Sequence, residues 1–248
     1  MKIIRPVILF FVTVVCTYIS EGRSFDELHI AGSCEVELIC RPDSAGVLLR
    51  HNDAENISFS YAGSSMSISA PSVPGSRELP KLTLYSDTLL RVVEVTGRSR
   101  VSVQEIKSGE SLALVASGAA SMMLDVVSAP NINISLSGSG KITISGAITA
   151  STLNFSVSGS GKVRADAVTA SRMTVTQRGS GKLVFAGSAR DCAVVERGTG
   201  SIDLQQLVSG KLDLKLFGDG HIFYPAGVPV RTAGNTDNII QVKPYQPL

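Results

Sequence analysis

The chain has 248 residues, a formal net charge of +2 at pH 7, no tryptophan and only 5% aromatic residues. Because 23 Lys and Arg side chains oppose 21 Asp and Glu side chains, the charge gives no global field that would attract nucleic acid or an anionic membrane. The scarcity of aromatic rings also argues against a cleft that stacks on sugars.

Residues 1–22 predict a secretory signal peptide. Lys2 and Arg5 provide a positive start, an apolar run follows, and small residues end the segment near Gly22, where we expect cleavage. The apolar run is short for a permanent membrane helix, although an uncleaved anchor is an alternative. Cys16 leaves lipid modification open, although the residues before it match a lipobox poorly. We expect an exported protein, located in the periplasm, on the outer-membrane surface or secreted, without a transmembrane domain in the mature chain.

Residues 23–91 carry strand patterns without a regular repeat. We expect them to form an N-terminal β part of the solenoid predicted below, or a cap on it. Cys34 and Cys40 share one face of a predicted strand, but six strand residues span roughly 20 Å, and a disulfide needs Cα atoms within about 7 Å. We therefore expect both to be small buried hydrophobic residues, like Cys192.

Residues 92–224 repeat a Gly-x-Gly phrase five times, with first glycines 19 to 21 residues apart. Apolar residues alternate with polar ones on both sides of each phrase, which is typical of strands with one buried face. A constant period of this length predicts an all-β solenoid with rungs of about 20 residues. Degenerate copies at Gly97 and Gly118 would bring the stack to seven coils. The alternative, ordinary hairpin turns in an antiparallel sandwich, does not require so constant a period.

Each Gly-x-Gly is expected to form a corner between two short strands. A glycine there permits a positive φ and close approach of neighbouring backbones. The corner glycines are Gly138, Gly140, Gly159, Gly161, Gly179, Gly181, Gly198, Gly200, Gly218 and Gly220.

Residues 225–248 form the predicted C-terminal capping tail. Pro225, Gly227 and Pro229 suggest that the chain leaves the stack after Tyr224. A last strand remains possible at residues 238–242.

The Gly-Ser-Gly series resembles the bacterial "putative auto-transporter adhesin, head GIN domain" family. The resemblance covers roughly residues 25–242 and includes the opening strand at 25–32 and the late segment at 224–229. It implies a right-handed parallel β-helix and an adhesin-like role. The sequence has no room for a translocator barrel, so the resemblance does not imply self-transport.

Aligning the repeats produces two basic columns beside the corners. Lys141, Lys162 and Lys182 come directly after Gly-x-Gly, whereas Arg178 and Arg197 come directly before it. Stacked strands lie about 4.8 Å apart, so these side chains could form an anion-binding surface column. The alternative is a solvated stripe that keeps the solenoid soluble and discourages lateral pairing.

Two polar residues fall at positions where the repeats elsewhere carry core residues. Gln177 and Glu196 align with Leu136, Val157 and Leu216. Either the alternation slips at these two positions, or polar groups face inward and need partners. The sequence leaves both possibilities open.

The sequence contains no convincing catalytic constellation, metal site or cofactor motif. His-Glu-x-x-His, Cys-x-x-Cys pairs and phosphate-binding loops are absent. The aspartates Asp166, Asp203, Asp213 and Asp219 fall at different rung positions, so no carboxylate pair recurs on one face. We therefore predict a protein that is not an enzyme and has no cofactor.

The resulting hypothesis is an exported, non-catalytic binding or structural module of the bacterial cell envelope, with an adhesin-like role. Its partner would be an acidic glycan, lipopolysaccharide or another envelope protein, and not nucleic acid. One alternative is a carbohydrate-active enzyme, a polysaccharide lyase or hydrolase on a β-helix scaffold. A second is a self-assembling envelope scaffold, in which solenoid ends stack between molecules.

Overall fold

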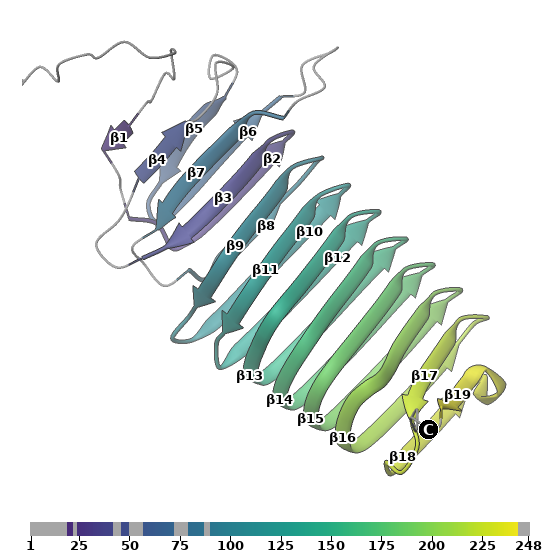
Figure 1. Ribbon diagram of the computed structural model, residues 1–248. Coiled ribbons are helices and arrows are strands. Elements are labelled where there is room, and N and C mark those ends of the chain that lie inside the picture. Colours follow the sequence, from purple (N-terminus) through teal and green to yellow (C-terminus); the bar gives the residue numbers. More distant parts are fainter. Residues whose placement is uncertain are drawn as a thin grey trace, which may run out of the picture.

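The computed structural model describes residues 19–21, 24–41, 46–49, 57–71, 79–86 and 90–242. The expected signal peptide lies outside these residues, except for a short strand at 19–21. The described residues are almost entirely strand, with one 3-10 helix at Thr236–Asn238 and no α-helix. The predicted all-β solenoid is confirmed, and Figure 1 shows its coils stacked along one axis.

The described strands, in chain order, are β1 (Ile19–Glu21), β2 (Glu27–Gly32), β3 (Glu35–Cys40), β4 (Gly46–Leu49), β5 (Ser58–Ala62), β6 (Ser65–Ala70), β7 (Lys81–Ser86), β8 (Val92–Val95), β9 (Arg100–Lys107), β10 (Ser111–Gly118), β11 (Ser121–Ser128), β12 (Asn131–Gly138), β13 (Lys141–Gly159), β14 (Lys162–Gly179), β15 (Lys182–Gly198), β16 (Ser201–Phe217), β17 (His221–Pro225), β18 (Val230–Gly234) and β19 (Ile239–Val242).

Each regular coil pairs in parallel with the next coil, in register except for one shift in each of the long strand pairings. Asn131 of β12 lies beside Thr152 of β13, and this register continues to Gly138 beside Gly159. Each strand from β13 to β16 starts after one Gly-x-Gly corner and runs around the coil to the next corner, so these four strands are 17 to 19 residues long. Equivalent positions of successive repeats therefore stack into columns that run along the solenoid.

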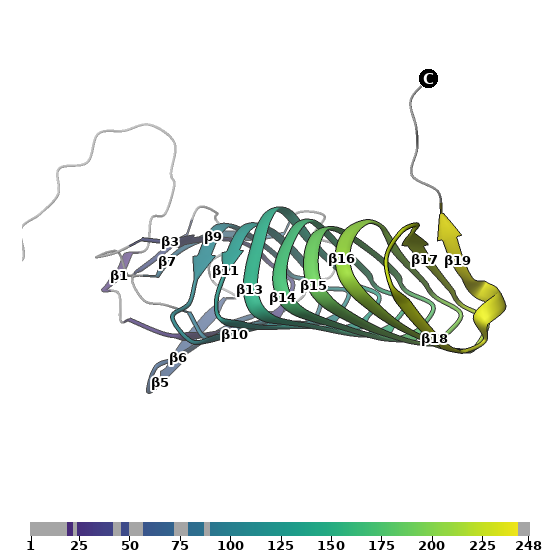
Figure 2. The ribbon, with the colours of Figure 1, turned by 90° about the horizontal axis from the view of Figure 1, so that it is seen from below.

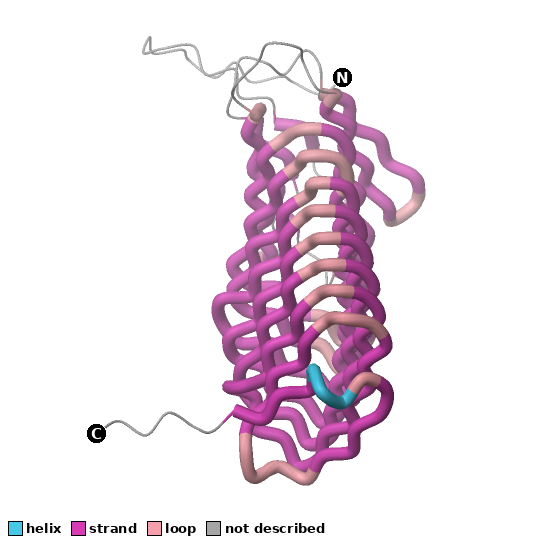
Figure 3. Tube along the Cα trace, turned by 90° about the vertical axis from the view of Figure 1, so that its right-hand side faces the viewer, coloured by secondary structure: helices cyan, strands magenta, loops and turns pink. Residues whose placement is uncertain are grey.

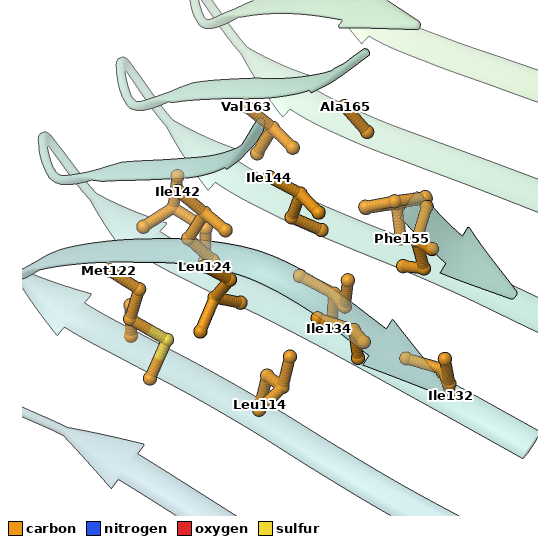
Figure 4. Packing of buried hydrophobic residues seen from close by; sticks show 14 of the residues in the cluster. Leu114, Met122, Leu124, Ile132, Ile134, Ile142, Ile144, Phe155, Val163 and Ala165 are labelled. Atoms are coloured by element: carbon orange, nitrogen blue, oxygen red, sulfur yellow. The ribbon is translucent and has the colours of Figure 1, made fainter. Parts of the chain in front are cut away.

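The core is the narrow space between the two strand layers. Alternate residues point into it, because successive side chains of a strand face opposite sides. One column of buried side chains consists of Ile134, Phe155, Val175, Val194 and Leu214. Figure 4 shows Ile134 and Phe155 pointing into this space with neighbouring Ile and Leu side chains. The ring of Phe155 also packs against that of Phe185, with centroids 4.7 Å apart.

The N-terminal coils are not stacked in chain order. The coil β2–β3 lies between the coil β6–β7 and the coil β8–β9, with parallel pairing on both sides. The chain thus leaves the stack after β3, returns as β6–β7 on the outer side, and then passes beyond β2–β3 to continue. The repeat pattern contains no information on this order.

Antiparallel strands cover the N-terminal end of the stack. β5 pairs with β6, β4 pairs with β7, and β1 adds to β4. Figure 2 shows β5 and β6 projecting at this end, away from the regular coils. This pairing satisfies the edge of the outermost coil, β6–β7, which would otherwise offer a template for aggregation.

Residues 225–242 stay in the stack, which corrects the expectation that the prolines would take the chain out of it. β18 pairs with β16, and β19 pairs with β17, both in parallel. Pro225 is the last residue of β17 and Pro229 precedes β18, so the missing proline N–H groups fall at the turn between them. The last coil is short but continues the repeat.

Candidate functional site

The Gly-x-Gly corners stack into one edge of the solenoid. In Figure 3 they appear as a ladder of short loops along the stack. The first glycines of the five phrases all have a positive φ. At Gly159 φ is +98°, and an added Cβ would stand 2.5 Å from the carbonyl oxygen of Gly138. The backbone thus approaches its neighbour so closely at this corner that only glycine fits without displacement.

The second glycines also lie close to the backbone of the preceding coil, and Gly161 meets a core side chain as well. A Cβ at Gly161 would meet a side-chain atom of Leu136, a core residue of the preceding coil, at 2.6 Å. It would also lie 3.0 Å from the carbonyl oxygen of Gly140. This glycine therefore leaves room for the large core residue of the preceding coil.

Three lysines stand in one row beside the corners. Lys141 pairs in register with Lys162, which pairs in register with Lys182. All three side chains are exposed, and none makes an ion pair with another described residue. The row continues as Ser201 and His221. Because adjacent parallel strands lie about 4.8 Å apart, these ammonium groups are held close together by a rigid scaffold.

Two arginines stand on the other side of the corners at 179–181 and 198–200, the first of which also carries Lys182. Arg178 and Arg197 are in register and exposed, and the guanidinium of Arg197 lies 4.9 Å from the centre of the Phe217 ring. The cation–π contact orients Arg197 without neutralising it. We use "basic edge" for the set Lys141, Lys162, Lys182, Arg178 and Arg197. Exposed hydroxyls stand at the corner tips between them, on Ser139, Ser160, Ser180 and Thr199.

Gln177 and Glu196 face inward, which decides the question that the sequence left open. Both side chains are fully buried, and their strands pair in the expected register with Val157 on one side and Leu216 on the other. The alternation therefore does not slip at these positions. Two polar groups therefore lie within the core, directly behind the two successive corners that carry Arg178 and Arg197.

The structure also contains a groove that sequence reasoning missed. It has a volume of about 530 Å³ and lies across β3, β9 and β11, with the carboxylates of Glu37, Glu105 and Asp125 in its wall. It lies where the pairing of β11 with β13 shifts register, a local irregularity that bends a sheet. The three residues come from separate coils and from strand positions that do not align, so no sequence pattern linked them.

Each carboxylate of this groove has a neighbouring partner. Glu105 forms an ion pair with Lys107 at 2.8 Å, and the hydroxyl of Thr83 donates to Glu37 at 3.3 Å. The hydroxyl of Ser145 lies 3.5 Å from Asp125. Within the described residues, no cluster of His, Cys, Asp and Glu has the arrangement of a metal site.

The three cysteines in the described part of the chain are free thiols. Burial raises the pKa of Cys192 to about 12 and, together with the charge of Glu105, that of Cys40 to about 11. Burial also raises the pKa of Cys34, although the hydroxyl of Ser99 opposes this shift through a 3.5 Å contact. These thiols are small core or near-core groups and not activated nucleophiles.

The described residues contain no helix long and apolar enough to cross a membrane. No curated protein matches the chain significantly. Among solved structures, a "putative adhesin" from Parabacteroides distasonis shares 14% identity, with a TM-score of 0.75 over 93% of this chain and 94% of that chain. A "putative adhesin" from Parabacteroides merdae shares 15% identity, with a TM-score of 0.68 over 92% and 93% of the two chains.

A third solved structure, described as a "putative lipid binding protein" from Parabacteroides distasonis, shares 16% identity, with a TM-score of 0.63 over 87% of this chain and 91% of that chain. At such identities the likeness shows a common fold. The family model for "Putative auto-transporter adhesin, head GIN domain" matches residues 24–186, which include the coils of the N-terminal half and the first three Gly-x-Gly corners. The chain therefore belongs to the "putative auto-transporter adhesin, head GIN domain" family.

Proposed function

We propose that the chain is an exported, non-catalytic binding module of the bacterial cell envelope, and that its basic edge binds acidic polysaccharides. Family membership supports an adhesin-like module. Export is supported by the order of charged, apolar and small residues in the first 22 positions. The catalytic alternative has less support, because the carboxylates of the one acidic groove described above are engaged with neighbouring residues.

The observation that carries the proposal is the in-register row Lys141, Lys162 and Lys182. Like charges on adjacent strands repel one another, so the row costs stability unless anions or solvent screen it. A polymer with regularly spaced carboxylate, sulfate or phosphate groups would relieve this repulsion at several positions at once. The solenoid holds the row without a conformational change, so little ordering entropy would oppose binding.

The two arginines extend the basic edge to the other side of the corner. An arginine guanidinium can bind a carboxylate or phosphate through two parallel hydrogen bonds, whereas a lysine acts as a point charge. The hydroxyls at the corner tips can donate to sugar oxygens between the charged groups. The basic edge therefore has the chemistry for an acidic glycan chain lying along the solenoid axis.

The test measures binding of the mature chain to polygalacturonate and to lipopolysaccharide, with dextran as the neutral control. Lipopolysaccharide is included because one structural neighbour is described as a lipid binding protein. Wild type is compared with the triple variant Lys141→Ser, Lys162→Ser and Lys182→Ser. A matched control removes three exposed basic residues outside the basic edge, through Arg172→Ser, Lys211→Ser and Lys215→Ser, none of which makes an ion pair with another described residue.

We expect the basic-edge variant to lose binding to an acidic polymer while its circular dichroism spectrum and melting temperature stay those of a folded solenoid. The control variant should retain most of the binding. If wild type binds neither acidic polymer, or if both triple variants bind equally well, the basic edge is only a solvated face. Cleavage of either polymer by the wild type would instead favour the enzyme alternative.

A further inference from the structure

Glu196 is the one carboxylate that is buried among the described residues, and Gln177 is buried beside it on the adjacent coil. Every other described position of this core column from Leu136 to Leu216 is apolar. A buried polar group without hydrogen bonds costs free energy, and a buried charge costs much more. The pair therefore needs a specific arrangement in order to be tolerated.

Each side chain makes one hydrogen bond to the corner of its own coil. The amide nitrogen Nε2 of Gln177 donates to the carbonyl oxygen of Gly181 at 2.5 Å. The backbone N–H of Gly200 donates to Oε1 of Glu196 at 3.3 Å. The second polar atom of each side chain, Oε1 of Gln177 and Oε2 of Glu196, is buried without a hydrogen-bond partner among the described residues.

The corner glycines enclose these two side chains. A Cβ added at Gly200 would overlap the amide nitrogen of Gln177, and a Cβ at Gly220 would lie 3.1 Å from Cγ of Glu196. Each polar side chain thus lies beneath the corner of its own coil and the corner of the following coil. Neither side chain can turn toward solvent without moving a corner.

The two unpartnered atoms are both hydrogen-bond acceptors when Glu196 is charged. An amide oxygen carries no proton, so the only proton that can join them must reside on the carboxyl group. The side chains are in register on coils about 4.8 Å apart, which places them next to each other. We propose that Glu196 is protonated in the folded solenoid and donates a hydrogen bond from Oε2 to Oε1 of Gln177, joining two coils behind the basic edge.

The electrostatic surroundings agree with a neutral Glu196. Burial raises the pKa of Glu196 to about 7, and the hydrogen bond from the Gly200 N–H opposes this shift only in part. The charged or titratable groups on the strands and corners packed around Glu196 are exposed and project outward from the coils. They are Arg178, Lys182, Arg197, Lys215, Asp219 and His221. On the following coil, Glu196 meets the apolar side chain of Leu216.

Ionisation of Glu196 removes this bond. Above neutral pH the carboxylate would face the amide oxygen of Gln177 as a second acceptor, and it would remain buried without a counter-charge in the core. The solenoid is then expected to loosen at the corner of residues 196–200. The pair acts as a proton-dependent link between two coils, independently of whether the basic edge binds a ligand.

The direct test is a carbon-13 NMR titration of the carboxyl groups in the folded chain from residue 23, with the Glu196 signal assigned by triple-resonance experiments. We expect a midpoint near pH 7 for Glu196. A midpoint near 4.5, the ordinary value for a glutamate, would overturn the proposal. This measurement needs no variant and does not depend on any binding assay.

A second test compares urea unfolding of wild type and Glu196→Gln at pH 5 and pH 8. A glutamine can donate to Gln177 at both pH values, so this variant should fold and should lack the pH effect of residue 196. From pH 5 to pH 8 the unfolding equilibrium constant of wild type should rise roughly tenfold or more beyond that of the variant. Glu110→Gln, at an exposed position, is the matched control and should behave like wild type. An equal pH dependence in wild type and Glu196→Gln would contradict the proposal.

Discussion

Gly159 lies directly over Gly138, and a Cβ built on Gly159 would stand 2.5 Å from the carbonyl oxygen of Gly138. The same relationship recurs between successive first glycines along the stack. The constant spacing of the Gly-x-Gly phrases in the sequence thus follows from one close backbone contact that is repeated at each of these coils. This contact also sets the position of the basic edge, because the charged residues stand immediately before and after it.

Substituting Gly159 with Ala should destabilise the fold strongly, because it combines a positive φ with a clash against backbone that cannot move aside. A non-glycine residue in such a conformation costs about 1–3 kcal/mol, and the clash adds to this. Gly63→Ala separates the two effects, since Gly63 has φ +63° but nothing within 4 Å of its added Cβ. Urea unfolding should show a clearly larger loss for Gly159→Ala. Equal losses of unfolding free energy in the two variants would mean that the contact between Gly159 and Gly138 does not add to the cost of the substitution.

The second glycine can be tested through its core neighbour. Gly161→Ala should destabilise because the new methyl group meets the Leu136 side chain at 2.6 Å, and Leu136→Ala should cost about 2–5 kcal/mol as a cavity. In the double variant the methyl group occupies part of that cavity. The combined loss should therefore be smaller than the sum of the single losses by at least about 0.5 kcal/mol. Strict additivity in a double-mutant cycle would contradict this packing.

The sequence predicted those features that depend on periodicity. Alternation of Ile, Val and Leu predicted the strands, and the constant spacing of the glycines predicted the solenoid. It also predicted that Lys141, Lys162 and Lys182 occupy equivalent positions, which the pairing of β13, β14 and β15 places side by side. Such inferences succeed because parallel in-register stacking converts a spacing along the chain directly into a distance in space.

Features that depend on long-range order could not be predicted in this way. Nothing in residues 23–91 shows that β2–β3 would insert between β6–β7 and β8–β9, since all of these strands carry similar alternating patterns. The groove at Glu37, Glu105 and Asp125 is lined by residues from three coils that occupy different strand positions, so the repeat pattern does not bring them together. The inward orientation of Gln177 and Glu196 was equally undetermined. A polar residue at a core position of the repeat is compatible both with an inward side chain and with a slip of the alternation that turns it outward.

The cysteines provide a chemical test of the core in the N-terminal coils and in β15. Cys34, Cys40 and Cys192 are free in the structure, and burial raises the pKa of each thiol above its ordinary value. The folded chain from residue 23 should therefore react slowly with iodoacetamide at pH 8, because the thiolate is the nucleophile. After unfolding in guanidinium without reductant, mass spectrometry should find all three alkylated. Recovery of only one alkylated cysteine would indicate a disulfide between the other two.

Replacing the buried polar pair by leucine tests its energetic cost. Gln177→Leu with Glu196→Leu restores the apolar column that already contains Leu136 and Leu216. The wild-type contribution of Glu196 is present below its unfolded pKa of about 4.5 and is lost as the pH rises through the folded pKa of about 7. The double variant should be more stable than wild type, and its advantage should be about 1–3 kcal/mol larger at pH 8 than at pH 5. An advantage independent of pH would show that Glu196 does not titrate in this range.

The basic edge makes a prediction about salt that distinguishes a row of charges from a single anchoring residue. An exposed charge contributes only about 0–1 kcal/mol, so Lys162→Ser alone should weaken binding to an acidic polysaccharide by no more than about fivefold. The triple lysine variant should lose far more, because a rigid polymer engages the row as a unit. Wild-type affinity should also fall steeply between 50 and 300 mM NaCl, as screening shortens the range of each charge to about 8 Å or less. Isothermal titration calorimetry across this salt range, with wild type, Lys162→Ser and the triple variant, measures all three effects. If Lys162→Ser alone abolishes binding, or if the affinity does not depend on salt, the ligand is held by a local pocket and not by the row of lysines.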